Sequence, residues 1–270
     1  MADNGFLPTI LEHKRTEVKR QQQKIPTADL VAQLQAAAPV RPFSTALRQL
    51  GRLGLIAEVK KQSPAKGLLV PNFDALRLAH IYADNGADAI SVLTDTRFWG
   101  GSLQYLKAIR TALPDGPPLL RKDVIIDSYQ LYEARVYGAD AVLLIAAALD
   151  ELALAELHHL TYQLGMEALV EVHTMEEAER VLPLRPRLLG INNRNLHTFV
   201  VDVDITRQII MSLPTADRPI VISESGIGGE ANGDRERLRG WGADAILVGE
   251  AIVTAPDPAA KVRALAGRQG

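Results

Sequence analysis

The sequence predicts an α/β protein built as a single (β/α)8 TIM barrel, and three observations lead to that prediction. The tetrapeptide Gly-Ala-Asp-Ala occurs three times, at 86–89, 138–141 and 242–245, each time between a helical pattern and an apolar run. The apolar runs are continuous rather than alternating, which is typical of parallel strands buried on both faces. Candidate strands begin about every 20–35 residues, as strand–helix–strand units require.

Eight candidate strands alternate with helical patterns over 270 residues, a length that one such barrel often has. In each repeated tetrapeptide the glycine can adopt the left-handed conformation that ends a helix, and a short turn then leads into a strand. We expect strands near 55–60, 89–94, 118–122, 141–145, 167–172, 188–191, 219–223 and 245–248. We expect helices near 74–85, 102–112, 128–137, 150–164, 175–182, 204–213, 233–241 and 257–266. A doubly wound open sheet is the main alternative, and it is disfavoured because no Gly-x-Gly-x-x-Gly pattern follows the first strand.

Residues 1–50 are expected to form a helical extension ahead of the barrel, which we assign to 51–270. The charged stretch 7–25 has a strong helical pattern, and Pro26 interrupts it. A second short helix is expected over Leu30–Ala38, which ends before the next proline. We expect the extension to pack on the barrel with most of its charged side chains in solvent.

The composition excludes several classes of function. Because the sequence contains no cysteine, it excludes disulfides, thiolate catalysis and cysteine-bound metals. The formal net charge of −2 does not indicate a basic surface of the kind that binds nucleic acid or a membrane. The longest apolar run, 141–149, is far shorter than the roughly 20 residues of a membrane span, and the N-terminal residues lack the apolar core of a signal peptide. We therefore expect a cytoplasmic protein, with a monomer as the working assumption for its assembly.

Polar and charged residues follow the predicted strands, at the end of the barrel where active sites lie. Glu58 and Lys60 end the first strand two residues apart, so their side chains share one face. A structural ion pair would explain these two residues alone, but not polar groups at nearly every strand end. The other polar ends are Thr94-Asp95, Arg121-Lys122-Asp123, Glu171 with His173, Asn192 to Asn195, Ser223 to Gly226, and Gly249-Glu250. The fourth strand instead ends in Ile145-Ala146-Ala147, which indicates an apolar wall.

Two features of these ends indicate a phosphorylated substrate. Gly226 and Gly249 follow the last two strands, the usual phosphate position in such barrels, where glycine lets backbone amides approach an anion. Cations and carboxylates at other strand ends add charge compensation and acid–base capacity: Lys60, Lys122, Arg194, Glu58 and Glu171. Decarboxylation or dehydration of a sugar phosphate fits this set.

The six histidines show no metal-binding pattern. His158 and His159 lie in a helical pattern, and we expect both at the surface. His173 shares a strand face with Glu171, and a structural and a functional role both stay open for it.

In order along the chain, the strand ends read IAEVKKQSP, SVLTDTRFWGGS, LLRKD, GADAVLLIAAAL, ALVEVHT, GINNRNL, SESGI and GADAILVGEA. This series closely resembles the indole-3-glycerol phosphate synthase family over nearly the whole chain, including the helical extension. The resemblance implies a carboxy-lyase of tryptophan biosynthesis that uses no cofactor or metal. It also implies the substrate 1-(2-carboxyphenylamino)-1-deoxyribulose 5-phosphate, which undergoes ring closure, decarboxylation and dehydration to indole-3-glycerol phosphate.

The resemblance further implies roles for individual residues. Lys122 matches the general acid that protonates the substrate ketone, and Lys60 matches the lysine that pairs with the anthranilate carboxylate. Glu171 matches an acid–base residue of the dehydration, and Glu58 matches the carboxylate that orients this network. The remaining matches are Asn192 in the catalytic set, Arg194 and Ser225 for substrate positioning, and Ser63, Gly226, Gly249 and Glu250 for phosphate binding. We expect burial and the neighbouring Lys60 to lower the pKa of Lys122 towards neutral pH.

Three departures from the family pattern bear on substrate affinity. Val124 stands where a phenylalanine normally forms part of the apolar wall around the anthranilate ring. Trp99 stands where phenylalanine is usual, and we expect it to restore some of that aromatic area. Ala65 replaces a common serine, and 228–234 is unusually rich in glycine.

Two alternatives stay open on the sequence alone. Another sugar-phosphate barrel, such as an isomerase, would explain Gly226 and Gly249 but not the combination of Lys60, Lys122 and Glu171. A catalytically silent paralogue that binds a phosphorylated ligand is favoured only by Val124.

Overall fold

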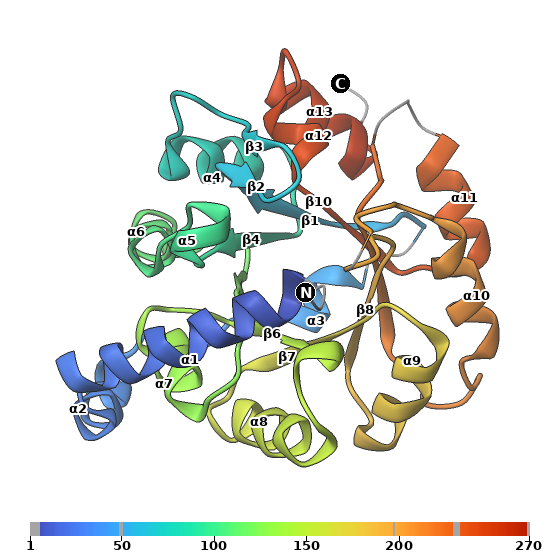
Figure 1. Cartoon of the computed structure of the whole chain (residues 1–270). Coiled ribbons are helices and arrows are strands. Elements are labelled where there is room, and N and C mark those ends of the chain that lie inside the picture. Colours follow the sequence, from blue (N-terminus) through green and yellow to red (C-terminus); the bar gives the residue numbers. More distant parts are fainter. Residues whose placement is uncertain (1–5, 49–50, 197, 229–232, 269–270) are drawn as a thin grey trace.

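The computed structural model describes residues 6–48, 51–196, 198–228 and 233–268. Its centre is a closed barrel of parallel strands, and β1 closes the ring by pairing with both β4 and β10 (Figure 1). The barrel strands are β1 (Gly54–Val59), β4 (Ala89–Leu93), β5 (Leu119–Lys122), β6 (Ala141–Ile145), β7 (Glu167–Val172), β8 (Leu188–Asn192), β9 (Ile220–Glu224) and β10 (Ala245–Val248). These bounds agree closely with the predicted strands, and the predicted TIM barrel is confirmed.

Helices cover the outside of the barrel, one after each strand (Figure 1). They are α4 (Ala75–Asp84), α6 (Leu103–Ala112), α7 (Ser128–Val136), α8 (Glu151–Gln163), α9 (Met175–Val181), α10 (Asp204–Ser212), α11 (Gly233–Trp241) and α13 (Pro258–Ala266). Short helices stand between three strands and their main helices, namely α5 (Thr96–Trp99), η2 (Ala146–Ala148) and α12 (Glu250–Val253), and η3 (Leu182–Leu184) follows α9. Most helices begin where the sequence supplies a side chain that accepts a backbone N–H, as at Asp74, Ser102, Asp127, Asp150, Thr174 and Asp257.

The repeated Gly-Ala-Asp-Ala segments clamp the amino-terminal end of the barrel. Their glycines have φ values of +96°, +90° and +99°, which only glycine adopts without strain, and each ends a helix. Each aspartate then accepts a hydrogen bond from the backbone N–H at the start of the preceding strand. These bonds run from Leu55 to Asp88, from Leu119 to Asp140 and from Val221 to Asp244, each at 2.8 Å. The repeat therefore ties the start of each of three strands to the turn that leads into the next strand.

The apolar core has two layers, one on each face of the sheet. Inside the barrel, alternate strand residues such as Ile56, Leu169 and Ile222 pack against one another. Outside it, residues of the opposite strand face, such as Leu55 and Val170, pack against the surrounding helices. Because both faces are buried, the strands read as continuous apolar runs.

The N-terminal extension packs on the barrel as predicted. It consists of α1 (Phe6–Lys24), α2 (Thr27–Gln33), η1 (Leu34–Ala36) and α3 (Phe43–Leu47), and α1 crosses the face of the barrel that is nearest to the viewer in Figure 1. The predicted single helix over Leu30–Ala38 was wrong, because the helix starts directly after Pro26 and tightens into η1. The predicted boundary at residue 50 lies outside the described residues.

Lys14 of α1 is not in solvent, although most charged residues of the extension were expected there. Its side chain is 1 % exposed, and its Nζ lies 2.8 Å from Asp95 and 2.9 Å from Asp123. Burial lowers the pKa of Lys14, but these two carboxylates together with Glu17 outweigh that effect and hold it above its ordinary value. The extension is therefore joined to the ends of β4 and β5 by a buried ion pair network.

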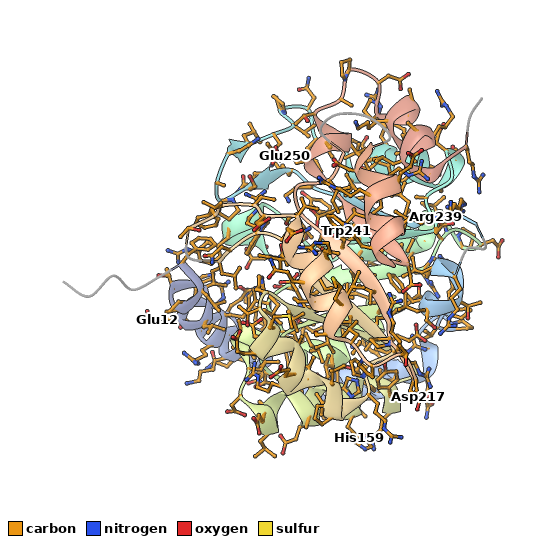
Figure 2. All side chains as sticks on the ribbon, turned by 90° about the vertical axis from the view of Figure 1, so that its right-hand side faces the viewer. Glu12, His159, Asp217, Arg239, Trp241 and Glu250 are labelled. Atoms are coloured by element: carbon orange, nitrogen blue, oxygen red, sulfur yellow. The ribbon has the colours of Figure 1, made fainter. Side chains whose placement is uncertain are left out.

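His158 was wrongly expected at the surface. It lies on the buried side of α8, where its ring packs edge-on to Tyr162 with centroids 4.9 Å apart. His159 is exposed at the rim of the molecule (Figure 2).

A small antiparallel hairpin, β2 (Gln62–Ser63) with β3 (Gly67–Leu68), follows β1.

Among the described residues, no helix is both long enough and apolar enough to cross a membrane.

We expect Asp140→Ala to lower the free energy of unfolding by about 2–4 kcal/mol. The carboxylate is buried and accepts bonds from the backbone N–H groups of Leu119 and Arg41, which the substitution would leave without their acceptor. Urea unfolding at neutral pH measures the change, with Asp115→Ala, at an exposed position, as the matched control. A change below about 0.5 kcal/mol, the range of ordinary surface substitutions, would show that the clamp is not stabilising.

Candidate active site

A cavity of about 840 Å3 opens at the carboxyl-terminal ends of the barrel strands. Its size is in the range of sites for small molecules. All residues that the sequence analysis assigned to the site line it: Glu58, Lys60, Ser63, Trp99, Lys122, Val124, Glu171, Asn192, Arg194, Ser225, Gly226, Gly249 and Glu250. The structure therefore brings these residues together, while the role of each one stays a prediction.

Lys122 stands at the centre of a buried group of carboxylates. Its Nζ donates to Glu224 Oε2 at 2.7 Å and to Glu171 Oε2 at 3.2 Å. Both carboxylates are nearly inaccessible, at 1 % and 3 % exposed. A proton donor thus sits between two buried carboxylates at the inner end of the cavity.

The expected direction of the Lys122 pKa was wrong. Burial does lower it, but Glu224, Glu171 and Glu58 outweigh burial and hold the pKa of Lys122 above its ordinary value. Lys60, which was expected to crowd Lys122, is instead hydrogen-bonded to Glu58. Lys122 is therefore a stably charged cation when the cavity holds no substrate.

Glu224 is a central site residue to which the sequence analysis gave no role. Burial raises its pKa to about 7, Glu171 adds to the rise, and Lys122 opposes it. A signal for it was present, because Glu224 lies two residues after Ile222 and so shares its inward face. Gly190 on the neighbouring strand is a second signal, since a Cβ there would collide with Glu224 Oε1.

Glu58 and Lys60 form the side-by-side pair that was predicted from their spacing. Lys60 Nζ donates to Glu58 Oε1 at 2.9 Å. A Cβ at Gly249 would collide with the same oxygen, so this glycine gives the Glu58 carboxylate its space. The glycine therefore has a packing reason in addition to the predicted role in phosphate binding.

Asn192 connects the buried carboxylate of Glu171 to the ends of β8 and β9. Its side chain hydrogen-bonds Glu171, and its Oδ1 accepts from Ser225 Oγ at 2.8 Å and from the backbone N–H of Arg194 at 3.1 Å. Arg194 in turn donates from Nη1 to the carbonyl of Phe199 at 3.2 Å. These bonds fix the ends of β8 and β9 relative to Glu171.

An aromatic cluster covers the apolar side of the cavity. The ring centroid of Phe6 lies 6.3 Å from that of Trp99 and 5.3 Å from that of Phe199, and all three residues line the cavity with Val124. They come from α1, α5 and the loop after β8, so distant segments supply aromatic area near the position where the usual phenylalanine is missing. Ile145 also lines the cavity, as its apolar strand end indicated.

Ser63, Gly226, Gly249 and Glu250 lie at the other end of the cavity, beside α12. Gly226 has a φ of +75°, and a Cβ there would collide with Val201, so a larger residue does not fit. Glu250 begins α12 and is paired with Lys66. Of the glycine-rich segment 228–234, residues 229–232 lie outside the described part of the chain.

His173 lies directly behind Glu171. Its Nε2 is 3.4 Å from Glu171 Oε1, and its Nδ1 is 3.4 Å from Glu177 Oε2. Burial lowers the pKa of His173, but Glu177 and Glu171 outweigh it and hold that pKa above its ordinary value. A line of titratable groups therefore runs from the cavity to the more exposed Glu177 on α9.

Within the described ranges, no group of three or more histidine or carboxylate side chains is arranged to hold a metal ion. Within the cavity, Lys60 pairs with Glu58, and Lys122 pairs with Glu171 and Glu224.

Replacing Glu224 by glutamine tests the raised pKa. When the pKa of a carboxyl is higher in the folded than in the unfolded protein, the free energy of unfolding falls as pH rises from the unfolded pKa through the folded pKa. Between about pH 5 and pH 8 we therefore expect the free energy of unfolding of the wild type to fall relative to Glu224→Gln, by up to about 3 kcal/mol. Urea unfolding at several pH values measures the gap. Glu156→Gln, at an exposed position, should follow the wild type, and a pH-independent gap for Glu224→Gln would contradict the assignment.

Solved structures with the same architecture show the fold alone. A 3-hexulose-6-phosphate synthase from Salmonella typhimurium superposes with a TM-score of 0.61 at 17% identity, covering 80% of this chain and 97% of its own. A thiamine phosphate pyrophosphorylase from Pyrococcus furiosus gives 0.58 at 18% identity, covering 83% and 96%.

Sequence relatives agree on one family. A protein of Roseiflexus sp. (strain RS-1) named indole-3-glycerol phosphate synthase is 55% identical over 97% of this chain and 98% of its own. Proteins of the same name from Roseiflexus castenholzii and Dehalococcoides mccartyi are 53% and 46% identical, over 97% and 96% of this chain and 98% and 99% of their own. The family described as indole-3-glycerol phosphate synthase matches residues 7–265, and the chain belongs to this family.

Proposed function

We propose that the protein converts 1-(2-carboxyphenylamino)-1-deoxyribulose 5-phosphate to indole-3-glycerol phosphate, carbon dioxide and water. The observation that carries this proposal is the position of Lys122, a charged lysine held at 2.7 Å and 3.2 Å by two buried carboxylates on the floor of the cavity. This arrangement supplies a proton donor and two acceptors to a substrate that must gain and lose protons in sequence.

Ring closure needs an acid at the substrate ketone. The aromatic carbon that bears the carboxylate attacks the ketone carbon, and the ketone oxygen takes a proton as the new bond forms. Lys122 is suited to give that proton, because a substrate that displaces Glu224 or Glu171 from Nζ would remove part of what holds its pKa high. Lys60, 2.9 Å from Glu58 at the same rim, is suited to hold the carboxylate that is lost next.

Decarboxylation returns the bonding electron pair to the ring. Dehydration then removes the new hydroxyl as water and a proton from the carbon next to nitrogen, which creates the indole double bond. Glu171 is suited to exchange the proton in this half. It is buried and bonded to Asn192, and His173, 3.4 Å behind it and with a raised pKa, stabilises the ionised carboxylate that accepts the proton.

The two ends of the cavity match the two ends of the substrate. The aromatic cluster with Val124 suits the anthranilate ring, and the glycine-lined end at Gly226 and Gly249 suits the phosphate. With Phe6 and Phe199 added to Trp99, Val124 no longer favours a silent paralogue. We further propose that the protein acts in the cytoplasm on this small substrate, without nucleic acid or membrane partners.

The direct test is the appearance of indole fluorescence when purified protein is mixed with the proposed substrate. A turnover in the ordinary range of enzymes, about 1–10³ s⁻¹, is the expected result. Tight binding of the substrate without any turnover would overturn the proposal in favour of a silent binding protein.

Lys122→Met should reduce kcat at least about a hundredfold and leave substrate binding largely intact. The substitution removes the acid of ring closure, a contribution of this order, but keeps the apolar stem of the side chain. Fluorescence turnover and calorimetric binding measure the two effects, with Lys107→Met, at an exposed position on α6, as control. Turnover close to that of the wild type would reject the role of Lys122.

Val124→Phe should lower KM about threefold to tenfold with little change in kcat, because it adds ring contact that ground state and transition state share. Steady-state kinetics measure the effect, and thermal unfolding checks that the larger side chain is accommodated. An unchanged KM would mean that Phe6, Trp99 and Phe199 already complete the wall.

A further inference from the structure

A second cavity, of about 580 Å3, lies on the outer side of the barrel between α11 and α13. Gly51 to Leu53, which directly precede β1, line it, so it lies beside the amino-terminal end of that strand. Figure 2 shows Arg239 of this cavity on the side of the molecule away from Glu12 of α1. It is therefore separate from the carboxyl-terminal mouth over which α1 lies.

The lining of this cavity is unusually rich in arginine: Arg52, Arg235, Arg239, Arg263 and Arg268. Three separate segments contribute them, namely the residues before β1, helix α11, and helix α13 with Arg268 two residues after its end. A run of charges along one solvated helix face is ordinary, but guanidinium groups from three segments that converge on one concavity are not. The formal charge of the whole chain is only −2, so this local excess is not a property of the overall composition.

The carboxylates of the described residues do not balance these cations. Arg52 pairs with Asp88 at 2.7 Å, and no other ion pair involves an arginine of this cavity in the part of the chain that the structure describes. Glu236 also lines the cavity without pairing with any of them there.

Structural hydrogen bonds account for only part of the donors. Arg235 donates from Nη1 to the carbonyl of Ala264 at 2.9 Å, and Arg263 donates to Asn85. The Nε of Arg235 is buried without a hydrogen-bond partner among the described residues. Burial lowers the pKa of Arg235, Arg52 and Arg239 lower it further, and Glu236 opposes them, so Arg235 lies within electrostatic range of two other lining cations.

We propose that this arginine cavity binds a small, multiply charged phosphate anion. The planar guanidinium group presents paired donors that match phosphate oxygens, and several of them around one concavity suit more than one phosphate group. The concave shape and limited volume suit a small molecule better than a protein surface, which needs a broad contact area.

The cavity adjoins the active site along one helix. Ala260 and Ala264 of α13 line both cavities. An anion in the arginine cavity would therefore be separated from the proposed phosphate end of the active site by α13. A test must therefore separate the two sites, since an anionic probe can enter either of them.

Calorimetric titration with pyrophosphate, in a phosphate-free buffer of low ionic strength, tests the proposal on the whole protein. The variant Arg235→Gln with Arg239→Gln removes two lining cations, neither of which lines the active-site cavity. The matched control, Arg207→Gln with Arg237→Gln, also removes two positive charges, from arginines of α10 and α11 that pair with Asp204 and Asp234 and do not line the cavity.

We expect the lining variant to bind pyrophosphate about tenfold more weakly or worse, and the control to stay within about twofold of the wild type. Thermal unfolding without anion checks that the lining variant is folded, because Arg235→Gln also removes the bond to the Ala264 carbonyl. ADP as a second probe identifies the source: equal affinity indicates recognition of the phosphates alone, and tighter binding indicates a nucleotide. Equal weakening in both variants, unchanged affinity in the lining variant, or preference for a glutamate-rich peptide would overturn the proposal.

Discussion

A charged lysine inside an apolar barrel is the constraint on which the rest of the site depends. An unpaired cation at this depth would cost several kcal/mol, so Lys122 needs the carboxylates of Glu171 and Glu224 beside it. Those carboxylates need space in turn, and the chain provides it with Gly190 beside Glu224 and Gly249 beside Glu58. Since the acids outnumber the bases here, one carboxyl carries a raised pKa, and the site holds a proton that it can release near neutral pH.

A second network of buried charges supports the first from the other face of β5. Lys122 points into the barrel, whereas Arg121 and Asp123 on either side of it pair with each other outside the barrel at 3.1 Å. Lys14 from α1 completes this network, and removing one partner of such a buried set typically costs about 3–5 kcal/mol. The N-terminal extension therefore belongs to the barrel energetically: it neutralises Asp123, anchors the end of β5 and thereby positions Lys122.

The sequence was sufficient for the barrel because every unit carries the same local signals. Continuous apolar runs, helix-ending glycines and capping residues agree with one another, so strands and helices were predicted closely. It also predicted that the assigned strand-end residues meet in one cavity, because the carboxyl ends of parallel strands lie together, although it gave no role to Glu224 or Phe6. It was insufficient where the partner of a charge is far away in the chain. Lys14 and Asp95 are separated by 81 positions, and nothing in a charged helical stretch reveals such a contact. The direction of the Lys122 pKa was wrong for the same reason, because pairing across the barrel, rather than order along the chain, decides which charges are its neighbours.

The polar residues at the two ends of the barrel have different roles. At the carboxyl ends the fold accepts buried carboxylates and unpaired polar atoms, which oppose stability but supply acid–base chemistry. At the amino ends the repeated aspartates satisfy backbone N–H groups and are paired with arginines, which stabilises the strands without touching the site. Arg52 takes part in both the clamp on Asp88 and the lining of the arginine cavity. Asp88 also accepts the N–H of Leu55. An anion that binds Arg52 would therefore compete with Asp88 for this arginine and affect the start of β1, the strand whose other end carries Glu58.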